Sequence, residues 1–596
     1  MPYDRGVRNQ KYAEIFVDWL VEAGYKTCFY VAGGNSMHLL NACRKKVRCI
    51  PVVHEVSGGI ASEYFNKVKK GEKSFVLVTA GPGLTNLITA IAGSWLESRE
   101  LLVIGGQVKS IDLASGDLRQ RGIQEIKGIE LVRSITKAAV RLYEPARKSV
   151  VFKAIDFART PRIGPCFIEV CLDVQGAIVD RDDYEDSPLE RFSIPVASAD
   201  QIKDIQTLIK KSERPVALFG GGLSYKFIEE HRLEIDTWGV PILTSWNGAD
   251  LYASDRPMWF GRPDTWGMRF SNLIIQESDL VLALGARLSI QQTGFNWQEF
   301  APLAKVVHVD IDQNELSKGH PLGTIQLRCD ANDVLEKLVE VKSKKNYWLS
   351  RCQKIKDEIP LNDPNNSKFQ DFIQPYHFVK QLSSLCLTHD TVIPCSSGGA
   401  NTVMMQAFEN KTGQNFFNNK ALASMGYGLA GAIGAGLADQ SRRTVLVEGD
   451  GGFSQNLQEL ATVAVQKLNL KIFIFANNGY ASIRMTQKNY FDGAYLGCDV
   501  ESGLGFPDWQ LLARAFGIKS LTLGENFATD KDFLDEWNSD QACLFVVPIH
   551  PEQTYFPKIS SQVTATGGME SAPLHRMSPP LADEVIAKLG LELDKK

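Results

Sequence analysis

The sequence has no apolar run approaching the roughly 20 residues that a helix needs to span a bilayer. Its most apolar stretch, residues 428–438, is rich in glycine and alanine and predicts a tightly packed buried helix. The chain of 596 residues has 65 lysines and arginines against 69 aspartates and glutamates, so its formal charge is only −4. Because this balance is near zero, we expect neither nucleic acid nor an anionic membrane as a partner.

The sequence also lacks a Cys-x-x-Cys pair, although it contains eleven cysteines. An odd number of widely spread cysteines predicts reduced core thiols in a cytoplasmic protein, not a disulfide framework or a zinc site. The first residues, Met1 to Arg5, are polar with no apolar segment after them, so we expect no signal peptide. A hydrophobic content of 44% with 22% charged residues is typical of a globular chain and excludes a disordered or fibrous one.

Short apolar segments bounded by glycines alternate with helical patterns, which is typical of parallel strands buried on both faces. We predict an α/β fold with three doubly wound parallel-sheet domains at 1–180, 195–342 and 370–549, followed by a tail at 550–596 that ends in a short helix. The polar segments 180–186 and 342–368 are predicted as linkers. Strands are predicted at 75–79, 101–105, 215–219, 241–244, 280–284, 305–310, 444–448, 471–476 and 542–547.

The strongest local signal is a pair of polar motifs after two predicted strands. Gly-Asp-Gly-Gly-Phe at 449–453 follows one strand, a helix is predicted at 456–467, and Asn477, Asn478 and Gly479 follow the next strand. Open parallel sheets bind ligands at the carboxyl ends of their strands, so these groups are expected to lie together. A carboxylate, an amide oxygen and a backbone carbonyl suit Mg²⁺, which leaves other positions for a diphosphate. Gly-Asp-Gly alone would favour a plain strand-turn-helix, but the asparagines that begin 27 residues after Asp450 favour the metal site.

This pairing resembles the signature of thiamine diphosphate (ThDP) enzymes. The resemblance implies that Asp450, Asn477 and the main-chain carbonyl of Gly479 bind Mg²⁺. The usual first asparagine of the signature is Ala476 here, which leaves Asn478 open as an alternative ligand. The resemblance also implies that ThDP is bound by Gly33, Gly34, Asn35, Thr79, Asn86, Ser397, Gly398, Ser424, Met425, Gly451 and Gly452.

Glu55, which follows a predicted strand, resembles the glutamate that activates the cofactor in that family. The resemblance implies that its carboxyl group hydrogen-bonds to the pyrimidine ring, which then takes the proton from the thiazolium carbon. The alternative is a carboxylate at a helix N-terminus, stabilised by the helix dipole. Met425 would hold the two cofactor rings in a bent arrangement, whereas a methionine beside a glycine is otherwise usually core filler.

The resemblance covers nearly all of the chain before the tail and is closest to the acetolactate (acetohydroxyacid) synthase group. It implies that Gln124 and Lys137 face the substrate. A glycine-rich turn after a strand and acidic residues at strand ends can admit a dinucleotide in the central domain. The resemblance implies FAD there, and the alternative is a vestigial Rossmann-like domain. The residues concerned are Gly220, Gly221, Gly222, Arg287, Asp310, Asp312 and Asp330.

As a whole, the resemblance implies a carboligase that decarboxylates pyruvate or a similar 2-oxo acid and transfers the two-carbon unit to a second carbonyl. It implies a homodimer or homotetramer, with Glu55 and Asp450 of one site on different chains. Thr486 stands where the group has a tryptophan, which predicts a wider acceptor pocket. The tail from Gln553 resembles that of relatives linked to surface-sugar synthesis, some of which use a keto-sugar nucleotide as acceptor.

No two histidines are adjacent, which favours carboligation over release of a free aldehyde. Three alternatives stay open from the sequence. They are a flavin oxidoreductase of the pyruvate-oxidase kind, a lyase or hydrolase for a different 2-oxo acid or acyl thioester, and a non-catalytic ThDP-binding subunit.

Overall fold

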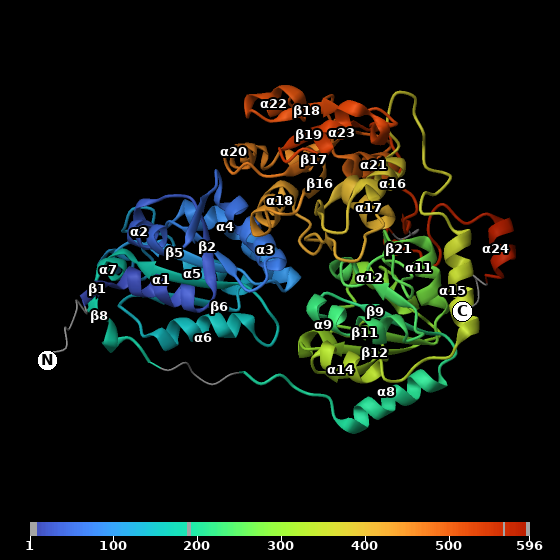
Figure 1. The fold of residues 1–596 in the computed structure, drawn as a ribbon, viewed down its shortest axis with the longest axis horizontal. Coiled ribbons are helices and arrows are strands. Elements are labelled where there is room, and N and C mark those ends of the chain that lie inside the picture. The colour runs from blue at the N-terminus through green and yellow to red at the C-terminus, as the bar shows by residue number, and fades with distance from the viewer. Residues whose placement is uncertain (1–8, 187–191, 564–566, 592–596) are drawn as a thin grey trace.

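The fold was described from a computed structural model, in which residues 9–186, 192–563 and 567–591 are placed. Met1 to Arg5, on which the expectation about a signal peptide depended, lie outside the described residues. Figure 1 shows three separate lobes, each built around one sheet of five or six strands. All neighbouring strands in these three sheets are parallel, which confirms the predicted class of three parallel-sheet α/β domains. The domain boundaries themselves stay predictions.

The N-terminal sheet has the strand order β3-β2-β4-β5-β7-β6. Alternate residues of β4 enter two different cores, with Phe75 and Leu77 in one and Val76 and Val78 in the other, so helices cover both faces. Its strands are β2 (Tyr25–Tyr30), β3 (Arg48–Pro51), β4 (Lys73–Val78), β5 (Leu102–Gln107), β6 (Ala138–Leu142) and β7 (Cys166–Cys171). Its helices are α1 (Tyr12–Glu22), α2 (Met37–Lys46), α3 (Glu55–Val68), α4 (Pro82–Glu97), α5 (Gly128–Val132), α6 (Lys148–Arg159) and α7 (Leu172–Gly176). Beside them, β1 (Asn9–Lys11) pairs antiparallel with β8 (Ile178–Asp180).

The central sheet has the order β10-β9-β11-β12-β13, so the direction of winding reverses between β9 and β11. Such a switch point opens a crevice at the carboxyl ends of the strands. The strands are β9 (Pro215–Phe219), β10 (Ile242–Thr244), β11 (Leu280–Leu284), β12 (Lys305–Asp310) and β13 (Ile325–Arg328). The helices are α8 (Ala199–Lys211), α9 (Tyr225–Glu230), α10 (Arg232–Asp236), α11 (Arg269–Glu277), α12 (Ile290–Thr293), α13 (Gln313–Leu316), α14 (Ala331–Leu338) and α15 (Asn346–Glu358).

The C-terminal sheet has the order β15-β14-β16-β17-β19-β18. Residues of β17 also alternate between two cores, with Phe473 on one face and Ile472 on the other. The strands are β14 (Thr391–Pro394), β15 (Asn415–Phe416), β16 (Thr444–Gly449), β17 (Leu470–Ala476), β18 (Lys519–Thr522) and β19 (Cys543–Pro548). The helices are α16 (Pro375–Leu385), α17 (Gly398–Ala407), α18 (Tyr427–Ala438), α19 (Asp450–Phe453), α20 (Leu460–Val465), α21 (Ala481–Tyr490), α22 (Trp509–Ala515) and α23 (Lys531–Trp537).

Helix α18 of the C-terminal domain packs closely against α3 of the N-terminal domain (Figure 1). A Cβ atom on Gly434 would lie 2.0 Å from the Ala61 carbonyl oxygen, so only glycine permits this approach. Beside it, the buried Glu63 carboxylate accepts hydrogen bonds from Tyr427 at 2.9 Å and from Arg99 at 2.7 Å. Every residue of α18 is buried, which confirms the predicted buried helix.

Three sequence predictions need correction. The segment 342–368 contains α15, because Trp348, Cys352 and Ile355 form one buried helix face among polar residues. The segment 180–186 packs on the N-terminal domain, where the Asp186 carboxylate accepts a hydrogen bond from the backbone N–H of Ser149 at 2.7 Å. The predicted helix at 456–467 is a 3₁₀ turn, η7 (Leu457–Glu459), followed by the short α20.

The tail packs on the central domain through α24 (Asp583–Leu589), which confirms its predicted terminal helix. A hairpin of β20 (Ser561–Val563) and β21 (Met569–Ser571) precedes it. The eleven cysteines are free thiols, and all except Cys49 are buried. Within the described part of the chain, no helix is both long and apolar enough to cross a membrane.

Candidate functional site

Asp450 lies at the start of α19, directly after β16, and only 1% of its side chain is exposed. Its Oδ1 accepts a hydrogen bond from the backbone N–H of Gly451 at 2.7 Å. Its Oδ2 accepts hydrogen bonds from the N–H groups of Asn477 at 3.0 Å and Gly479 at 3.3 Å. Burial raises the pKa of Asp450 to about 7, although these N–H groups act to lower it. The ends of β16 and β17 thus bring the predicted metal ligands together around one buried carboxyl group.

The side chain of Asn477 carries a buried oxygen that lacks a partner. In the described part of the chain, its Oδ1 accepts no hydrogen bond. A buried amide oxygen without a partner is costly, and beside a buried carboxylate it completes a donor set that suits a hard cation. Asn478, the alternative ligand, is exposed and has a left-handed φ of 55°. The residues therefore fit Mg²⁺ bound by Asp450, Asn477 and the Gly479 carbonyl.

Glycines around this position leave room for a diphosphate. Gly398 begins α17 with a φ of 78°, and a Cβ atom placed on it would meet nothing within 4 Å. Ser397 precedes it as the cap of α17, so free N–H groups at the helix start are available. Gly451 has no room for a side chain, because a Cβ atom there would lie 2.2 Å from the Tyr480 ring. Gly452 would instead meet the Glu448 carboxyl group at 3.0 Å.

Ser424 and Met425 precede α18, in a segment anchored by side chains from two other loops. The Ser396 hydroxyl donates a hydrogen bond to the Ser424 carbonyl. The Asn456 amide donates to the Gly426 carbonyl at 2.7 Å, and Gly426 has a left-handed φ of 80°. Met425 is half-buried. These contacts hold the segment predicted to lie beneath the cofactor rings.

Glu55 is the first residue of α3 and is 8% exposed. The Asn86 amide donates a hydrogen bond to its Oε2 at 3.0 Å. Just before it, the N–H groups of Val53 and His54 donate to the Glu459 carboxylate of the C-terminal domain at 3.1 and 3.0 Å. Glu55 thus lies where a helix N-terminal carboxylate is expected, and its role as the activating glutamate stays a prediction.

The other predicted residues of the N-terminal domain fall into two places. The Asn35 N–H donates to the Thr79 hydroxyl at 3.3 Å, and the Asn35 amide donates to the Ile123 carbonyl at 3.2 Å, beside Gln124. Gly33 packs directly on Thr79, and Gly34 begins the 3₁₀ turn η1 (Gly34–Ser36). Lys137 lies elsewhere, because its Nζ donates to the Thr160 and Arg162 carbonyls at 2.6 and 2.7 Å. It faces a cavity of about 430 Å³ toward the central domain.

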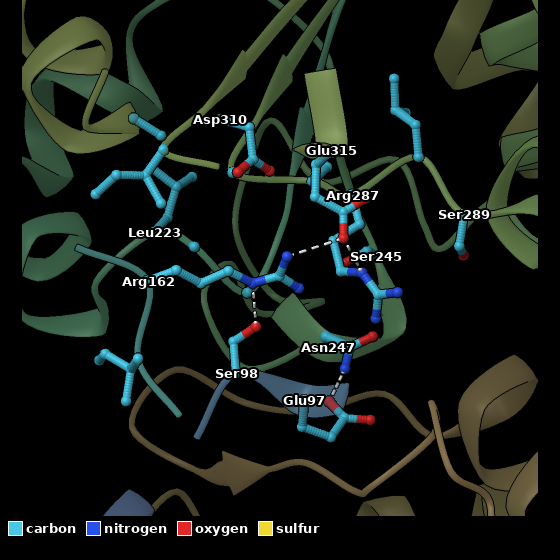
Figure 2. Close-up of a pocket in the computed structure, with 18 of the residues that line it drawn as sticks. Glu97, Ser98, Arg162, Leu223, Ser245, Asn247, Arg287, Ser289, Asp310 and Glu315 are labelled. Atoms are coloured by element: carbon cyan, nitrogen blue, oxygen red, sulfur yellow. Dashed lines mark hydrogen bonds and ion pairs between the residues drawn. The ribbon is translucent and has the colours of Figure 1, made fainter. Parts of the chain in front are cut away.

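A larger cavity of about 780 Å³ opens at the switch point of the central sheet (Figure 2). Small-molecule sites usually occupy about 300–1,000 Å³. Five of the seven residues predicted there line it, namely Gly221, Gly222, Arg287, Asp310 and Asp330. Gly220 does not, because it packs on the Gly285 backbone. Asp312 does not either; it lines the smaller cavity that Lys137 faces, and its Oδ2 accepts a hydrogen bond from Arg162 at 2.7 Å.

The charges of this cavity largely neutralise one another. The Glu315 carboxylate lies 3.0 Å from nitrogens of Arg162, Arg287 and Lys318. Burial acts to raise the pKa of Glu315, but Lys318 and Arg287 lower it to about 2. Asp310, at the end of β12, has a pKa raised by burial. A glycine-lined crevice with an acidic strand end fits a dinucleotide and its ribose hydroxyls.

Several residues of these sites were missed from the sequence. Glu97, Ser98 and Arg162 of the N-terminal domain form part of the central cavity wall, as Figure 2 shows. Tyr555 of the tail packs against Gly399 and interacts with the Asn477 side chain. The Arg484 guanidinium donates to the Asn478 carbonyl at 3.1 Å and to the Pro551 carbonyl at 2.6 Å. None of these contacts follows from a local motif, so only the tertiary fold shows them.

Comparison with known proteins assigns the fold and the motifs to one family. "Thiamine pyrophosphate enzyme, N-terminal TPP binding domain" matches residues 10–131. The corresponding "central domain" matches 202–338, and the "C-terminal TPP binding domain" matches 396–541. Thiamine pyrophosphate is another name for ThDP, and the chain belongs to this family of ThDP enzymes.

Relatives named as acetolactate synthases align over most of the chain. The "Probable acetolactate synthase large subunit" of Methanocaldococcus jannaschii is 31% identical over 537 residues, which is 86% of this chain and 87% of that protein. The "Acetolactate synthase isozyme 1 large subunit" of Escherichia coli is 27% identical over 92% of this chain and 95% of its own length. The "Acetolactate synthase, chloroplastic" of Arabidopsis thaliana is 29% identical over 85% of this chain and 77% of its own length.

Proposed function

We propose that the protein is a ThDP- and Mg²⁺-dependent carboligase that decarboxylates pyruvate, or a similar 2-oxo acid, and transfers the two-carbon unit to a second carbonyl. The observation that carries this proposal is the buried Asp450 carboxyl group beside the Asn477 oxygen, which has no hydrogen-bond partner among the residues that the structure describes. The acetolactate synthase relatives supply the reaction class. The retained Glu55 argues against a non-catalytic subunit.

The chain's own residues would bind, orient and hold protons in this reaction. Asp450, Asn477 and the Gly479 carbonyl would hold Mg²⁺, and N–H groups at the starts of α17 and α19 would face the diphosphate. Bound ThDP would supply a thiazolium carbon that adds to the oxo carbon of the donor and keeps the electron pair freed with CO₂. Glu55, oriented by Asn86, would hold a proton at the pyrimidine ring. Gln124 is proposed as a substrate-facing residue, whereas Lys137, which the resemblance gives the same role, faces the cavity toward the central domain.

Replacing Glu55 tests this assignment. Glu55→Gln keeps the hydrogen-bonding shape but removes the acid, so ThDP binding should stay nearly intact while turnover falls about 10²–10⁴-fold. ThDP affinity is measured by calorimetry, and pyruvate consumption is followed by CO₂ release. Near-wild-type turnover in the variant would contradict the proposed role.

We also propose that the central cavity binds FAD, with Gly221 and Gly222 at the diphosphate and Asp310 at the ribose. Flavin absorbance in the purified protein tests this. If the protein were instead a pyruvate-oxidase-like enzyme, anaerobic pyruvate would bleach the flavin. For the carboligase we expect the flavin spectrum to stay unchanged while pyruvate is consumed.

The catalytic unit is proposed to be a homodimer or homotetramer with Glu55 and Asp450 of one site on different chains. Apolar side chains next to the predicted site residues support this, since Val53 is 52% and Ile123 is 83% exposed in the single chain. Mixing Glu55→Gln with Asp450→Asn chains should restore up to about a quarter of wild-type turnover, because a hybrid dimer keeps one intact site. No recovery in the mixture, with hybrids shown by mass spectrometry, would place both residues in one chain.

The acceptor is proposed to be bulkier than a second pyruvate, such as a ketone or a keto-sugar nucleotide. Thr486, where acetolactate synthases carry tryptophan, lies on the wall of a cavity beside α21. Its small side chain leaves space that an indole ring would fill. Product analysis with a panel of aldehydes, ketones and keto-sugar nucleotides tests this choice. Acetolactate as the only product would contradict this proposal and would assign the acetolactate synthase reaction to the protein.

A further inference from the structure

A cavity of about 710 Å³ lies between α21, the tail and one turn of the central domain. This volume is at the upper part of the range for small-molecule sites and far exceeds the needs of a three-carbon acid. Two aromatic side chains of its wall are exposed to solvent, since Phe295 is 56% and Tyr490 is 42% exposed. Its aromatic lining consists of Trp266, Phe295, Tyr490, Tyr495, Tyr555 and Phe556.

One cation on this wall, Lys558, has no counter-charge among the described residues. Lys558 Nζ lies 2.9 Å from the Met485 sulfur and 5.5 Å from the centre of the Trp266 ring. Among the residues the structure describes, no carboxylate lies within ion-pair distance of it, and burial alone lowers its pKa.

The other two cations that line the cavity are paired. Lys488 lies 3.4 Å from Glu552, and Arg484 lies 3.3 Å from Asp499. A half-buried ammonium group without an anion is unfavourable, and an anionic ligand would relieve it.

Two side chains connect this cavity to the metal site. Arg484 lines the cavity and donates hydrogen bonds to the carbonyls of Asn477 and Asn478 at 3.4 and 3.1 Å. Tyr555 also lines it and interacts with the Asn477 side chain. A molecule in the cavity would therefore touch residues that position the metal loop.

We propose that this cavity receives the acceptor substrate and that Lys558 binds an anionic group on it, a carboxylate or a phosphate, while the aromatic walls pack against the remainder. The assignment of this cavity to the acceptor substrate rests on the proposed carboligase function. The anion site does not, because it follows from the unpaired lysine and the cavity.

The test compares charged acceptors with related compounds that lack the charge, in the enzyme loaded with ThDP and Mg²⁺. The pairs are dihydroxyacetone phosphate with dihydroxyacetone, and 2-oxobutyrate with its methyl ester. Lys558→Gln should raise the KM for the charged acceptors about 10- to 100-fold and leave the neutral ones within about twofold. Lys558→Arg should restore most of the difference. A larger effect in the first pair identifies a phosphate-bearing acceptor, and in the second pair a carboxylate.

Lys356→Gln is the matched control, because Lys356 is also half-buried beside a ring, 4.7 Å from the centre of Trp259, but lies outside this cavity. Amine-selective labelling gives a readout without turnover. Charged acceptors should protect Lys558 and leave Lys356 labelled. If wild-type enzyme consumes no pyruvate but Lys558 is protected, the carboligase function fails and the anion site stands. If Lys558→Gln treats charged and neutral acceptors alike and no acceptor protects Lys558, the proposal is overturned.

Discussion

The two cofactor sites differ in how their charged groups are held. In the C-terminal domain, Asp450 meets only backbone N–H groups, and the nearby Asn477 oxygen has no partner in the described structure. In the central domain, Glu315 is already surrounded by three cationic side chains. The groups of the first site thus suit a cation from outside the chain, whereas the charges of the second site are already balanced by the chain's own side chains.

The largest expected effect comes from removing the carboxylate of the first site. Asp450→Asn should weaken Mg²⁺-dependent ThDP binding by at least about 100-fold, because even outer partners of a metal ligand are worth 10- to 100-fold. Flavin content should stay unchanged. Calorimetry of the apo protein with ThDP and Mg²⁺, together with flavin absorbance, measures both quantities.

The matched variant at the other site is Asp310→Asn, which also neutralises a buried strand-end carboxyl group. We expect it to reduce flavin content and to leave Mg²⁺-dependent ThDP binding near the wild-type value. If either substitution impaired both sites equally, the two sites would not bind their cofactors independently.

The next largest effect is a dependence of central-domain stability on pH. His308 in β12 is 1% exposed, with its Nε2 2.9 Å from the Ala286 carbonyl. Burial, aided by the charge of Lys318, lowers its pKa from 6.5 to about 4. The unfolded chain binds the proton more readily in this interval, so stability is full above about pH 6.5 and is lost as pH falls toward about 4.

The loss attributable to His308 should be roughly 3 kcal/mol between about pH 7.5 and about pH 4. The thermal midpoint of flavin release measures it. His308→Gln removes the titrating group and should flatten that part of the pH profile, even if it lowers stability overall. A variant with the same pH slope as wild type would show that another group controls the transition.

The central sheet illustrates how much of the fold was predictable. The bounds of β9, β11 and β12 agree with the prediction, because β9 and β11 are continuous apolar runs and β12 has a valine-rich centre that ends in an acidic residue. Helix α15 was missed because its three buried residues are spread among polar and charged residues, a composition that favours a linker. Tertiary burial overrides composition at such a segment.

The candidate sites also contain residues that the sequence could predict and residues that it could not. Asp450, Asn477 and Gly479 could be grouped from the sequence because they belong to one strand-helix-strand unit, although their role as ligands stays a prediction. Arg162 and Tyr555 could not be found, because one reaches the central cavity from another domain and the other approaches the metal loop from the tail. Short motifs predict local geometry, and walls contributed by distant segments need the fold.

The smallest expected effect concerns that tail residue. The Tyr555 ring fills the space against Gly399, and the Asn477 side chain acts to lower the pKa of the Tyr555 hydroxyl. Tyr555→Phe keeps the ring and removes the hydroxyl, so Mg²⁺-dependent ThDP binding should weaken about tenfold without loss of thermal stability. Tyr480→Phe is the control, because the Tyr480 ring backs Gly451. Equal losses in both variants would mean that the effect is not specific to the hydroxyl of Tyr555.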